Sequence, residues 1–525
     1  MRRASAMIVV LALLLSLCAC QGLDAPTEST GPSQSASGNV PTFPNQPECA
    51  HRDENADQLC DDCQKSVLVA LDFYCVNDLH GKIVDLEGRP GLDELTTYLK
   101  NVRATQENTI FLSAGDMWLG SPESNNTTGR IITDWLNEMD FKAMAIGNHE
   151  YDWREDGVRT NAELAEFPLL GVNIVDKQTG KQPDYCQSSV MVECGGVQIG
   201  IIGSIGSSYT SISGDFTTDA SFQSGAALTK LVKEESEKLR LAGADVIVYL
   251  LHDGIGEHTT GTQTISDSKL SAYYDPSLSS GGFVDLVFEG HTHHRYTFVD
   301  SAGVYHLQGG SDSWGITHAQ LMVNVVTGEV STVTAGYVAS DTYQNLEDDP
   351  LIDQLLDKYY DEISDAYRVL GTNGRYRNSD ALRAIGAQVY YEAGLERWGD
   401  EYQLVFGGGF LSVRSPYNLP AGDVTYADLE ALFPFDNELV LCSIKGRDLK
   451  SKYFNSTNQN VFIYCGTYGQ SVREDLDPNA TYYVVVDSYS STYAYNNLTE
   501  IERYTPGVYL RDLIADYIRS GRMEN

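Results

Sequence analysis

An apolar run at residues 67–76 ends abruptly in two side chains that can bind a metal ion. The run reads VLVALDFYCV, and Asp78 and His80 follow it within the sequence NDLHG. Apolar, β-branched runs of this length are typical of strands buried in a sheet. In α/β sheets, functional groups collect beyond the carboxyl ends of the strands, where loops aim several side chains at one point. The sequence therefore predicts a buried strand with chemistry at its end.

Four later apolar runs end in the same way. The groups that follow them are Asp116 after residues 108–114, Asn148, His149, Glu150 and Asp152 after 141–146, His252 at the end of 244–252, and His291 and His293 after 283–289. Residues 130–136 are predicted to be helical, so the order is strand, helix, strand. That order is typical of a parallel sheet covered by helices.

The ligands at these strand ends are carboxylate, amide and imidazole groups without a thiolate. The set is Asp78, His80, Asp116, Asn148, His252, His291 and His293. It suits a pair of divalent ions such as manganese, zinc, iron or cobalt, with the identity left open. One carboxylate has to bridge the two ions, and we expect Asp116, on its own central strand, to do so. The alternative is that these residues are unrelated caps and core histidines, in which case the Gly-Asp, Gly-Asn-His-Glu and Gly-His-x-His signatures all arise by accident.

The N-terminus has the features of an export signal. Residues 1–20 begin with two arginines, continue with an apolar core that is short for a membrane span, and end in Leu-Cys-Ala-Cys. This ending resembles a bacterial lipobox, which implies cleavage before Cys20 and acylation of its thiol; cleavage without lipidation is the alternative. Residues 21–48 are rich in Ser, Gly, Pro and Thr and are predicted to form a flexible tether. We therefore expect an exported protein at the cell envelope or surface, in contact with the membrane through a lipid anchor alone.

A small motif rich in cysteine and aspartate, residues 49–66, follows the tether. A calcium loop would use Asp53, Asn55, Asp57 and Asp61, although Gln58 stands where such loops need Gly and Gln64 where they need Glu. A zinc site would use Cys49, His51, Cys60 and Cys63 instead. Outside the cell, two of these thiols could also oxidise to a disulfide. Two further pairs, Cys186 with Cys194 and Cys442 with Cys465, could be bridged, and the sequence leaves all of these alternatives open.

Length and charge limit the remaining organisation and the partners. The 525 residues leave room for two sizeable domains after the exported part, and no later segment resembles a membrane span. Apolar residues at helical spacing in 349–365 predict a helix that joins the domains, within a linker at 346–365. A formal net charge of −37 argues against a nucleic-acid polymer or an anionic membrane surface as the partner, because both would be repelled.

The runs NDLHG, GD, GNHEYD and GHTH, with His252 at a strand end, resemble the motifs of the calcineurin-like metallophosphoesterases. The resemblance is to the secreted bacterial 5'-nucleotidase and UDP-sugar hydrolase family and extends from residue 67 nearly to the C-terminus. It implies an α/β protein with a four-layer β-sandwich flanked by helices at 67–345 and a smaller α/β substrate-binding domain at 366–525. It also implies that Asp78 and His80 hold one ion and Asn148 and His252 the other, with Asp116 bridging and His291 and His293 completing the pair.

The same resemblance implies a catalytic dyad. His149 follows the ligand Asn148 directly, so it could stabilise the transition state of phosphate-ester hydrolysis or protonate the leaving oxygen, and Asp152 could orient its imidazole. The alternative is that His149 only holds Asn148 in place. Glu150 is expected to be structural.

The substrate contacts are expected in the second domain. Arg414, in LVFGGGFLSVR, and Arg377, in RYRN, resemble phosphate-binding arginines, although the family pattern opens with Asn-Gly-Gly and reaches its arginine sooner, and Arg375 rivals Arg377. Phe435, in PFDN, resembles the family's base-stacking ring, and Tyr493 or Tyr495 would close the other face of the base. The alternative for each ring is core packing.

The sequence therefore predicts an extracellular two-metal phosphohydrolase that removes phosphate from nucleotides. A UDP-sugar hydrolase or a 2',3'-cyclic-nucleotide phosphodiesterase on the same scaffold is the alternative among enzymes. A non-catalytic nucleotide-binding protein of the cell surface is the alternative of another class.

Overall fold

The structure is a computed structural model of the chain. It describes residues 52–63, 66–85, 89–212, 214, 216–409, 411–414, 416–453, 463–465, 476–492, 497–504 and 508–524. The predicted signal peptide, the tether, Cys20, Cys49, His51 and Gln64 lie outside these residues, so the predictions about them stay predictions. Within the described residues, no helix is both long enough and apolar enough to cross a bilayer.

The first sheet carries the buried strand predicted at residues 67–76. Its six strands are, in spatial order, β15 (Val330–Ala339), β14 (Gly315–Asn324), β1 (Leu68–Val76), β2 (Thr109–Ser113), β3 (Phe141–Ala145) and β4 (Leu169–Leu170). The strands from β1 to β4 run parallel, as predicted, whereas β14 pairs antiparallel with β1. The sheet is therefore mixed, and its parallel half ends at the predicted metal ligands.

A second sheet of seven strands lies against the first. Its strands are β10 (Thr262–Thr264), β12 (Arg295–Val299), β13 (Tyr305–Gly309), β11 (Leu286–Glu289), β9 (Val246–His252), β7 (Val197–Ile205) and β6 (Ser189–Cys194). Strands β7, β9 and β11 are mutually parallel. Side chains from both sheets, such as Phe73 and Leu112 from one and Val248 and Phe288 from the other, form one buried cluster between them.

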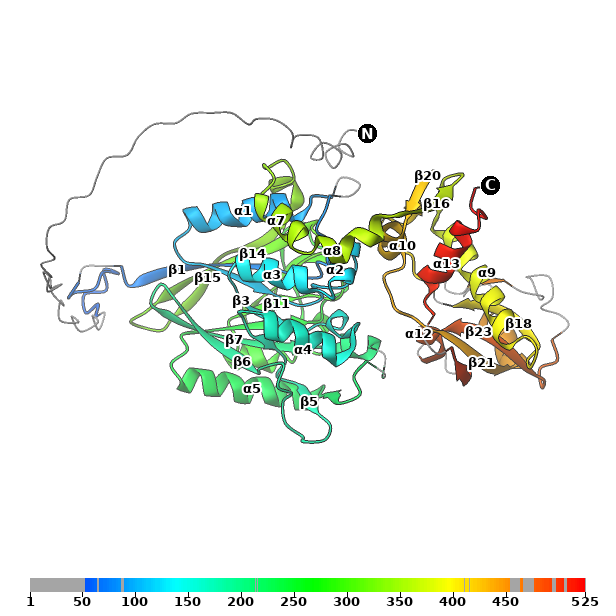
Figure 1. Ribbon diagram of the computed structural model, residues 1–525. Helices are drawn as coiled ribbons and strands as arrows, with labels where there is room; N and C mark the ends of the chain where they lie inside the picture. Colours follow the sequence, from blue (N-terminus) through cyan, green and yellow to red (C-terminus); the bar gives the residue numbers. More distant parts are fainter. Residues whose placement is uncertain are drawn as a thin grey trace, which may run out of the picture. The chain divides into compact units, whose positions relative to one another are not determined.

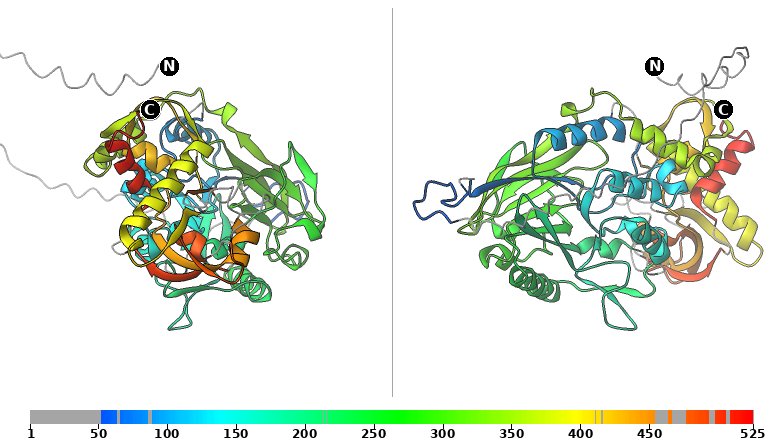
Figure 2. Two further views of the ribbon diagram at one scale, coloured as in Figure 1. Left: turned by 90° about the vertical axis from the view of Figure 1, so that its right-hand side faces the viewer. Right: turned by 60° about the vertical axis from the view of Figure 1, so that its left-hand side comes forward.

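Helices cover the outer faces of this sandwich (Figures 1 and 2). Alternate residues of β1 point to opposite faces, so Phe73 lies between the sheets while Tyr74 packs beneath the outer helices. The helices on the side of the first sheet include α1 (Leu92–Thr105), α3 (Arg130–Glu138) and α7 (Pro350–Lys358), and those on the other side include α5 (Ala226–Leu241) and α6 (Ser277–Ser280). The layers are helix, sheet, sheet, helix, as the family resemblance implied.

The C-terminal part is a smaller α/β unit with its own core. Its five-stranded sheet has the order β22 (Ile463–Cys465), β18 (Leu404–Gly409), β23 (Thr481–Asp487), β21 (Leu439–Lys445) and β24 (Thr499–Arg503). Three helices pack against one face of it, namely α9 (Ser379–Trp398), α10 (Tyr426–Leu432) and α13 (Leu510–Arg519). Val440 and Cys442 lie in a second cluster on the other face of this sheet.

The predicted joining helix is shorter than the apolar spacing suggested. It is divided into α7, α8 (Tyr360–Ile363) and a 3-10 turn (Ser364–Tyr367), and its apolar residues Leu351, Leu355 and Ile363 pack on the helices of the first domain. Cys75 is buried between the two sheets. Cys186, Cys194 and Cys442 are free thiols, so the two disulfides left open by the sequence are absent from the described residues.

Candidate active site and metal centre

All seven predicted metal ligands gather at the edge where the parallel strands of both sheets end. The loops after β1, β2 and β3 carry Asp78, His80, Asp116 and Asn148. Strand β9 ends in His252, and the loop after β11 carries His291 and His293. Each sheet therefore contributes ligands, and neither sheet alone could form the site.

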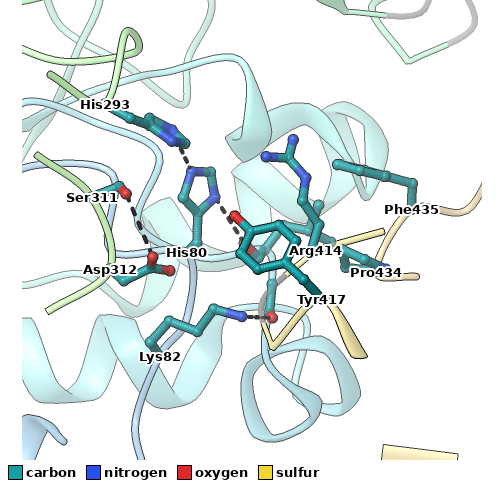
Figure 3. Close-up of a pocket in the computed structure, with 11 residues that line it drawn as sticks. His80, Lys82, His293, Ser311, Asp312, Arg414, Tyr417, Pro434 and Phe435 are labelled. Carbon is teal, nitrogen blue, oxygen red and sulfur yellow. Dashed lines mark hydrogen bonds between the residues drawn. The ribbon is translucent and has the colours of Figure 1, made fainter. Parts of the chain in front are cut away.

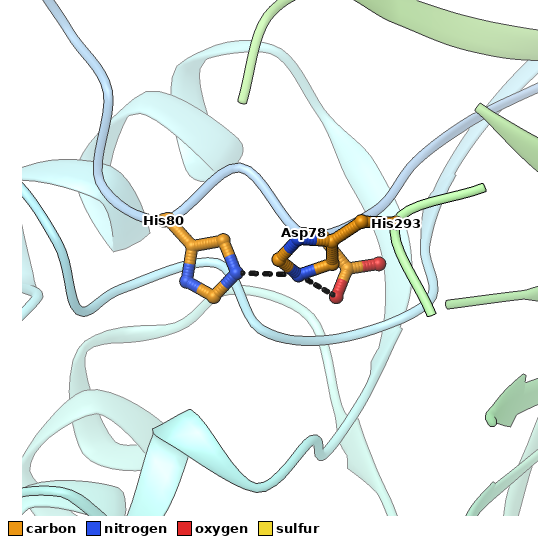
Figure 4. Close-up of side chains that lie close together, drawn as sticks. All are labelled: Asp78, His80 and His293. Carbon is orange, nitrogen blue, oxygen red and sulfur yellow. Dashed lines mark hydrogen bonds and ion pairs between the residues drawn. The ribbon is translucent and has the colours of Figure 1, made fainter. Parts of the chain in front are cut away.

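One group of ligands consists of Asp78, His80 and His293 (Figure 4), with ligand atoms within 4.8 Å of one another. The Nε2 atoms of His80 and His293 are 3.0 Å apart, and His293 Nε2 lies 3.4 Å from Asp78 Oδ1. Two imidazole nitrogens and a buried carboxylate that converge in this way suit a divalent cation.

A second group consists of Asp116, His252 and His291, again within 4.8 Å. His252 Nε2 lies 3.2 Å from Asp116 Oδ2 and 3.2 Å from the side-chain oxygen of Asn148. Burial opposes protonation of His252, but Asp116 outweighs it and raises the pKa of His252 to about 10. This pair therefore attracts a cation strongly, whether a proton or a metal ion.

Backbone carbonyls orient two of the imidazoles toward the ligand groups. His80 Nδ1 lies 3.1 Å from the carbonyl oxygen of Leu119, and His252 Nδ1 lies 2.7 Å from that of Ala114. A carbonyl only accepts, so each Nδ1 carries a proton and each Nε2 is the nitrogen that faces the site. A metal ion would take the place of any proton on His252 Nε2. Burial and the neighbouring His293 lower the pKa of His80 well below its usual value, which keeps it neutral, as a ligand must be. The donor set therefore fits the predicted pair of divalent ions.

Five of the seven ligands adopt a left-handed backbone conformation. Their φ angles are 49° for Asp78, 53° for His80, 54° for Asp116, 67° for His291 and 57° for His293. Such a conformation costs about 1–3 kcal/mol for a non-glycine residue and persists only where its surroundings enforce it. The concentration of this strain in the ligand loops is typical of a functional site.

The glycines of the predicted motifs are needed because the loops approach each other closely. A Cβ on Gly147 would lie 2.3 Å from Asp116 Oδ1 and 2.7 Å from the Asp116 nitrogen. Gly115 has φ +91°, and its Cβ would lie 2.7 Å from His252 Nδ1. The glycines of the Gly-Asp and Gly-Asn-His-Glu signatures therefore allow the loops after β2 and β3 and the end of β9 to lie in contact.

Glu150, expected to be structural, links two of the ligand loops. Its buried carboxylate accepts backbone N–H groups of Asp116 at 2.9 Å, Met117 at 2.8 Å and Gly147 at 2.7 Å. Burial and the charge of Asp116 raise the pKa of Glu150 to about 7. One side chain thus fixes the backbone on both sides of the proposed bridging ligand.

His149 lies beside the second group and is bonded to Asp152, as the dyad prediction requires. Its Nδ1 is 2.5 Å from Asp152 Oδ2, and its backbone N–H donates to Asp116 Oδ1 at 2.8 Å. Burial disfavours the charged imidazole, but Asp152 and Asp116 outweigh it and raise the pKa of His149 to about 9. Asp152 occupies Nδ1, so Nε2 is the nitrogen left to face a substrate.

Two cavities open at this edge, and residues of both domains line them. One is lined by Asn148, His149, Asp152, Ser211, Phe216, His291, Ser412, Arg414, Phe435, Asp436, Asn437 and Tyr489. The other, shown in Figure 3, is lined by His80, Lys82, Leu119, Gly120, His293, Ser311, Asp312, Arg414, Tyr417, Pro434 and Phe435. Arg414 and Phe435 line both, so the two domains share one site beside the ligand groups.

Comparison with known proteins gives the same two parts. Residues 71–295 match the calcineurin-like phosphoesterase family, and residues 404–462 match the 5'-nucleotidase C-terminal domain. The chain belongs to the calcineurin-like phosphoesterases that carry a 5'-nucleotidase C-terminal domain. Family membership confirms the resemblance found in the sequence, and it makes the protein a metal-dependent phosphoric ester hydrolase.

Individual members of the family align over most of the chain. Protein UshA of Yersinia enterocolitica is 25% identical over an alignment of 472 residues that covers 77% of this chain and 82% of the relative. A 5'-nucleotidase of Vibrio vulnificus is 23% identical over an alignment of 436 residues that covers 71% of this chain and 73% of the relative. The crystal structure of a 5'-nucleotidase precursor from Thermus thermophilus superposes with a TM-score of 0.65 at 17% identity, covering 86% of this chain and 96% of the other. The two-domain fold is therefore shared with this phosphoesterase family.

Two of the five predicted substrate residues line the cavities. The Phe435 ring stacks on His149 with centroids 5.6 Å apart and an interplanar angle of 28°, and the Arg414 guanidinium carbon lies 5.0 Å from the ring centroid. Arg377 lies elsewhere, where it donates to the side-chain oxygen of Asn373 at 2.8 Å and to the Met523 carbonyl at 3.2 Å. Tyr493 and Tyr495 lie outside the described residues, so their role stays a prediction.

The structure adds two residues that sequence reasoning missed. Tyr489 lines the cavity that also contains Asn148 and His149. It belongs to the same tyrosine-rich run as Tyr493 and Tyr495, and this run was the signal in the sequence that could have identified it. Arg511, in helix α13, donates to Asp436 and to the carbonyl oxygens of Pro434 and Phe435, both at 3.4 Å. It holds the loop that presents Phe435, and no motif in the sequence marks it.

The cysteine-rich motif is described in part. Asp53 and Asn55 accept backbone N–H groups within the loop, and Gln58, where a calcium loop needs Gly, adopts φ +68°. The buried Cys60 sulfur accepts the backbone N–H of Cys63 at 3.4 Å. Because Cys49 and His51 lie outside the described residues, calcium, zinc and disulfide all stay predictions.

We expect Glu150→Ala to weaken binding of both metal ions, because three backbone N–H groups lose their acceptor and the Asp116 loop can relax from its strained conformation. Glu155→Ala is the matched control, since Glu155 also accepts two backbone N–H groups, those of Asp219 and Ala220, at 2.9 Å but away from the ligand loops. Both variants should lose about 1–3 kcal/mol of stability. Calorimetric titration with Mn²⁺ separates them: equal metal affinity in the two variants would contradict the assigned role of Glu150.

Proposed function

We propose that the protein is an exported two-metal enzyme that removes phosphate from nucleotides. The arrangement that supports this most directly is the cavity in which the His149 imidazole, Arg414 and the Phe435 ring lie together beside the metal-ligand groups. It combines groups suited to a phosphoryl centre with a ring suited to a base. The relatives named 5'-nucleotidase support the same substrate class.

The metal groups and the dyad would have separate roles. A bound pair of divalent ions, held by the seven ligands and bridged by Asp116, would lower the pKa of a shared water and neutralise charge on the phosphoryl oxygens. His149 Nε2 would donate to the leaving oxygen or to the phosphoryl group, with Nδ1 held by Asp152. Arg414 would offer its forked donors to the phosphate.

The second domain would recognise the rest of the nucleotide. In this structure the Phe435 ring is in contact with the His149 imidazole and the Arg414 guanidinium. A base can therefore stack on a face of the ring that one of these groups covers only after that side chain moves. Tyr489 lines the same cavity and offers a second ring. We propose that residues 346–365 link the metal domain, 67–345, to this substrate domain, 366–525. We also propose that reorientation at the linker admits the substrate.

His149→Asn is expected to retain both ions while the turnover of AMP falls by about a hundredfold or more, because the metal groups stay intact and the donor to the leaving oxygen is lost. Steady-state rates, together with the metal content of the purified variant, check this. Near-normal turnover would return His149 to the role of a support for Asn148.

Phe435→Ala is expected to reduce kcat/KM for AMP through the loss of about 1–3 kcal/mol of base stacking. Hydrolysis of para-nitrophenyl phosphate, an ester without a base, should change much less. Tyr360→Ala, at an exposed ring on α8, serves as the control for removal of an aromatic side chain. Equal losses on both esters would show that Phe435 supports His149 rather than binding a base.

A substrate panel distinguishes the alternative functions. Phosphate release from AMP, UMP, ATP, UDP-glucose and 2',3'-cyclic AMP would be compared at several metal concentrations. A strong preference for UDP-glucose or for the cyclic nucleotide would select one of the alternative enzymes. Binding of nucleotides without hydrolysis of any of them would instead indicate a binding protein of the cell surface.

We propose that Cys20 carries the lipid that attaches the enzyme to the membrane, on the basis of the lipobox-like sequence alone. The full-length protein expressed in a bacterial host should partition into the detergent phase of Triton X-114, and Cys20→Ser should move it to the aqueous phase. Aqueous partition of the unchanged protein would favour export without lipidation.

A further inference from the structure

We propose that Gln308 is a positioning residue for both halves of the metal centre. It lies on β13, is fully buried, and belongs to none of the motifs that identify the ligands. Its side-chain amide binds the loop that carries His291 and His293, one ligand from each group. The inference rests on the proposed metal centre and adds to it the residue that fixes the geometry of this loop.

The Gln308 amide contacts the loop before, between and after the two ligands. Its nitrogen donates to the Gly290 carbonyl at 2.9 Å, and its oxygen accepts the His294 backbone N–H at 2.9 Å. The Thr292 hydroxyl lies 2.9 Å from the amide nitrogen and 3.2 Å from the amide oxygen. One planar group thus spans the whole segment from 290 to 294.

This loop needs an external support. Both ligands have left-handed φ angles, 67° and 57°, in which a non-glycine residue is strained. Within the loop, Thr292 N–H donates to the Gly290 carbonyl at 2.8 Å, and the Gly290 N–H donates to Asp253 at 3.0 Å. Asp78 accepts the His291 N–H at 2.9 Å, and the His294 Nδ1 lies 2.6 Å from the Thr292 carbonyl. At the exit of the loop, the backbone N–H of His294 donates to Gln308.

A buried network fixes which way the amide points. The Tyr296 hydroxyl donates to Glu289 Oε2 at 2.6 Å, so it can only accept from Gln308 Nε2, which lies 3.0 Å away. The two protons of the amide are then used by Tyr296 and by the Gly290 carbonyl. The amide oxygen must face His294, and a flipped amide would place donor against donor at that nitrogen.

The network continues away from the metal ligands and anchors the support. Glu289 Oε1 lies 3.3 Å from His306 Nδ1, and His306 Nε2 lies 3.5 Å from Asp300. All three side chains are buried. A glutamate at position 308 would have nearly the shape of Gln308, but it could not donate to Gly290 or Tyr296 and would add a negative charge beside Glu289. The position therefore requires an amide rather than merely a side chain of this size.

The test compares metal binding in Gln308→Glu and Gln308→Met with a matched glutamine variant. Gln320→Met is the control, because the Gln320 amide also donates to a buried group, the carboxylate of Asp72 at 3.1 Å, but from β14 in the other sheet. Mn²⁺ titration would be followed by calorimetry on the full chain, and thermal unfolding of the metal-free proteins would report stability. Activity is not needed for this measurement.

We expect both Gln308 variants to bind ions at both positions about 10–100-fold more weakly, the usual effect of removing a group that orients metal ligands. Gln320→Met should bind both as tightly as the unchanged protein. Tight binding at both positions in the Gln308 variants, or weakening at only one, would overturn the proposal. Should the Gln308 variants not fold, Tyr296→Phe, which removes the hydroxyl that orients the amide, makes the same test with the same expected direction. Failure of the unchanged protein to bind two ions would contradict the proposed centre itself, which is a separate outcome.

Discussion

A hydrogen bond between the backbone N–H of His291 and the carboxylate of Asp78 joins the two sheets at the edge where the ligands lie. Both oxygens of Asp78 are 2.9 Å from this nitrogen. The Asp78 N–H also donates to the Gly115 carbonyl at 2.9 Å, and its own carbonyl accepts from Asp312 at 2.7 Å. Because Asp78 is fully buried, its charge has to be balanced by such donors and by a cation. The site therefore forms only when the two sheets pack against each other at this edge.

The supports of the ligand loops share one physical arrangement. Glu150 accepts backbone N–H groups from the loops after β2 and β3, and Gln308 hydrogen-bonds to the backbone of the loop after β11. Both are buried side chains that bond to backbone rather than to a ligand side chain. Backbone anchors of this kind hold strained φ angles in place while the imidazoles and carboxylates stay available to metal ions. Side chains that are fixed in the buried core thus determine the backbone geometry of the ligand loops.

The sequence predicted which side chains gather at this edge, because each of them lies at or shortly after the end of a buried strand. The apolar runs located the strand ends, and the fold brings the ends of parallel strands to one edge, so Asp78, Asp116 and His252 could be placed together without coordinates. The four-layer architecture followed from the resemblance to the family, since the runs alone did not show that the strands divide into two sheets. The break of the joining helix near Tyr359 could not be seen either, because the apolar spacing continues through it.

The residues that sequence reasoning missed depend on contacts between distant segments. Gln308 and Arg511 carry no motif, and their roles appear only when β13 lies beside the loop after β11 and α13 beside the loop at 434–436. Arg377 shows the converse, since its local pattern suggested a phosphate ligand while its donors bond to Asn373 and Met523. Short motifs report the chemistry of a strand end, but they do not report which side chains hold it in place.

Loops of both sheets are proposed to form one centre for two ions, with Asp116 between them. Anomalous diffraction from crystals grown with Mn²⁺ tests it most directly, because the peaks locate the ions independently of any assay. We expect two peaks a few ångströms apart, one at Asp78, His80 and His293 and one at Asn148, His252 and His291, each within bonding distance of an Asp116 oxygen. A single peak, or two peaks of which only one lies at Asp116, would contradict it.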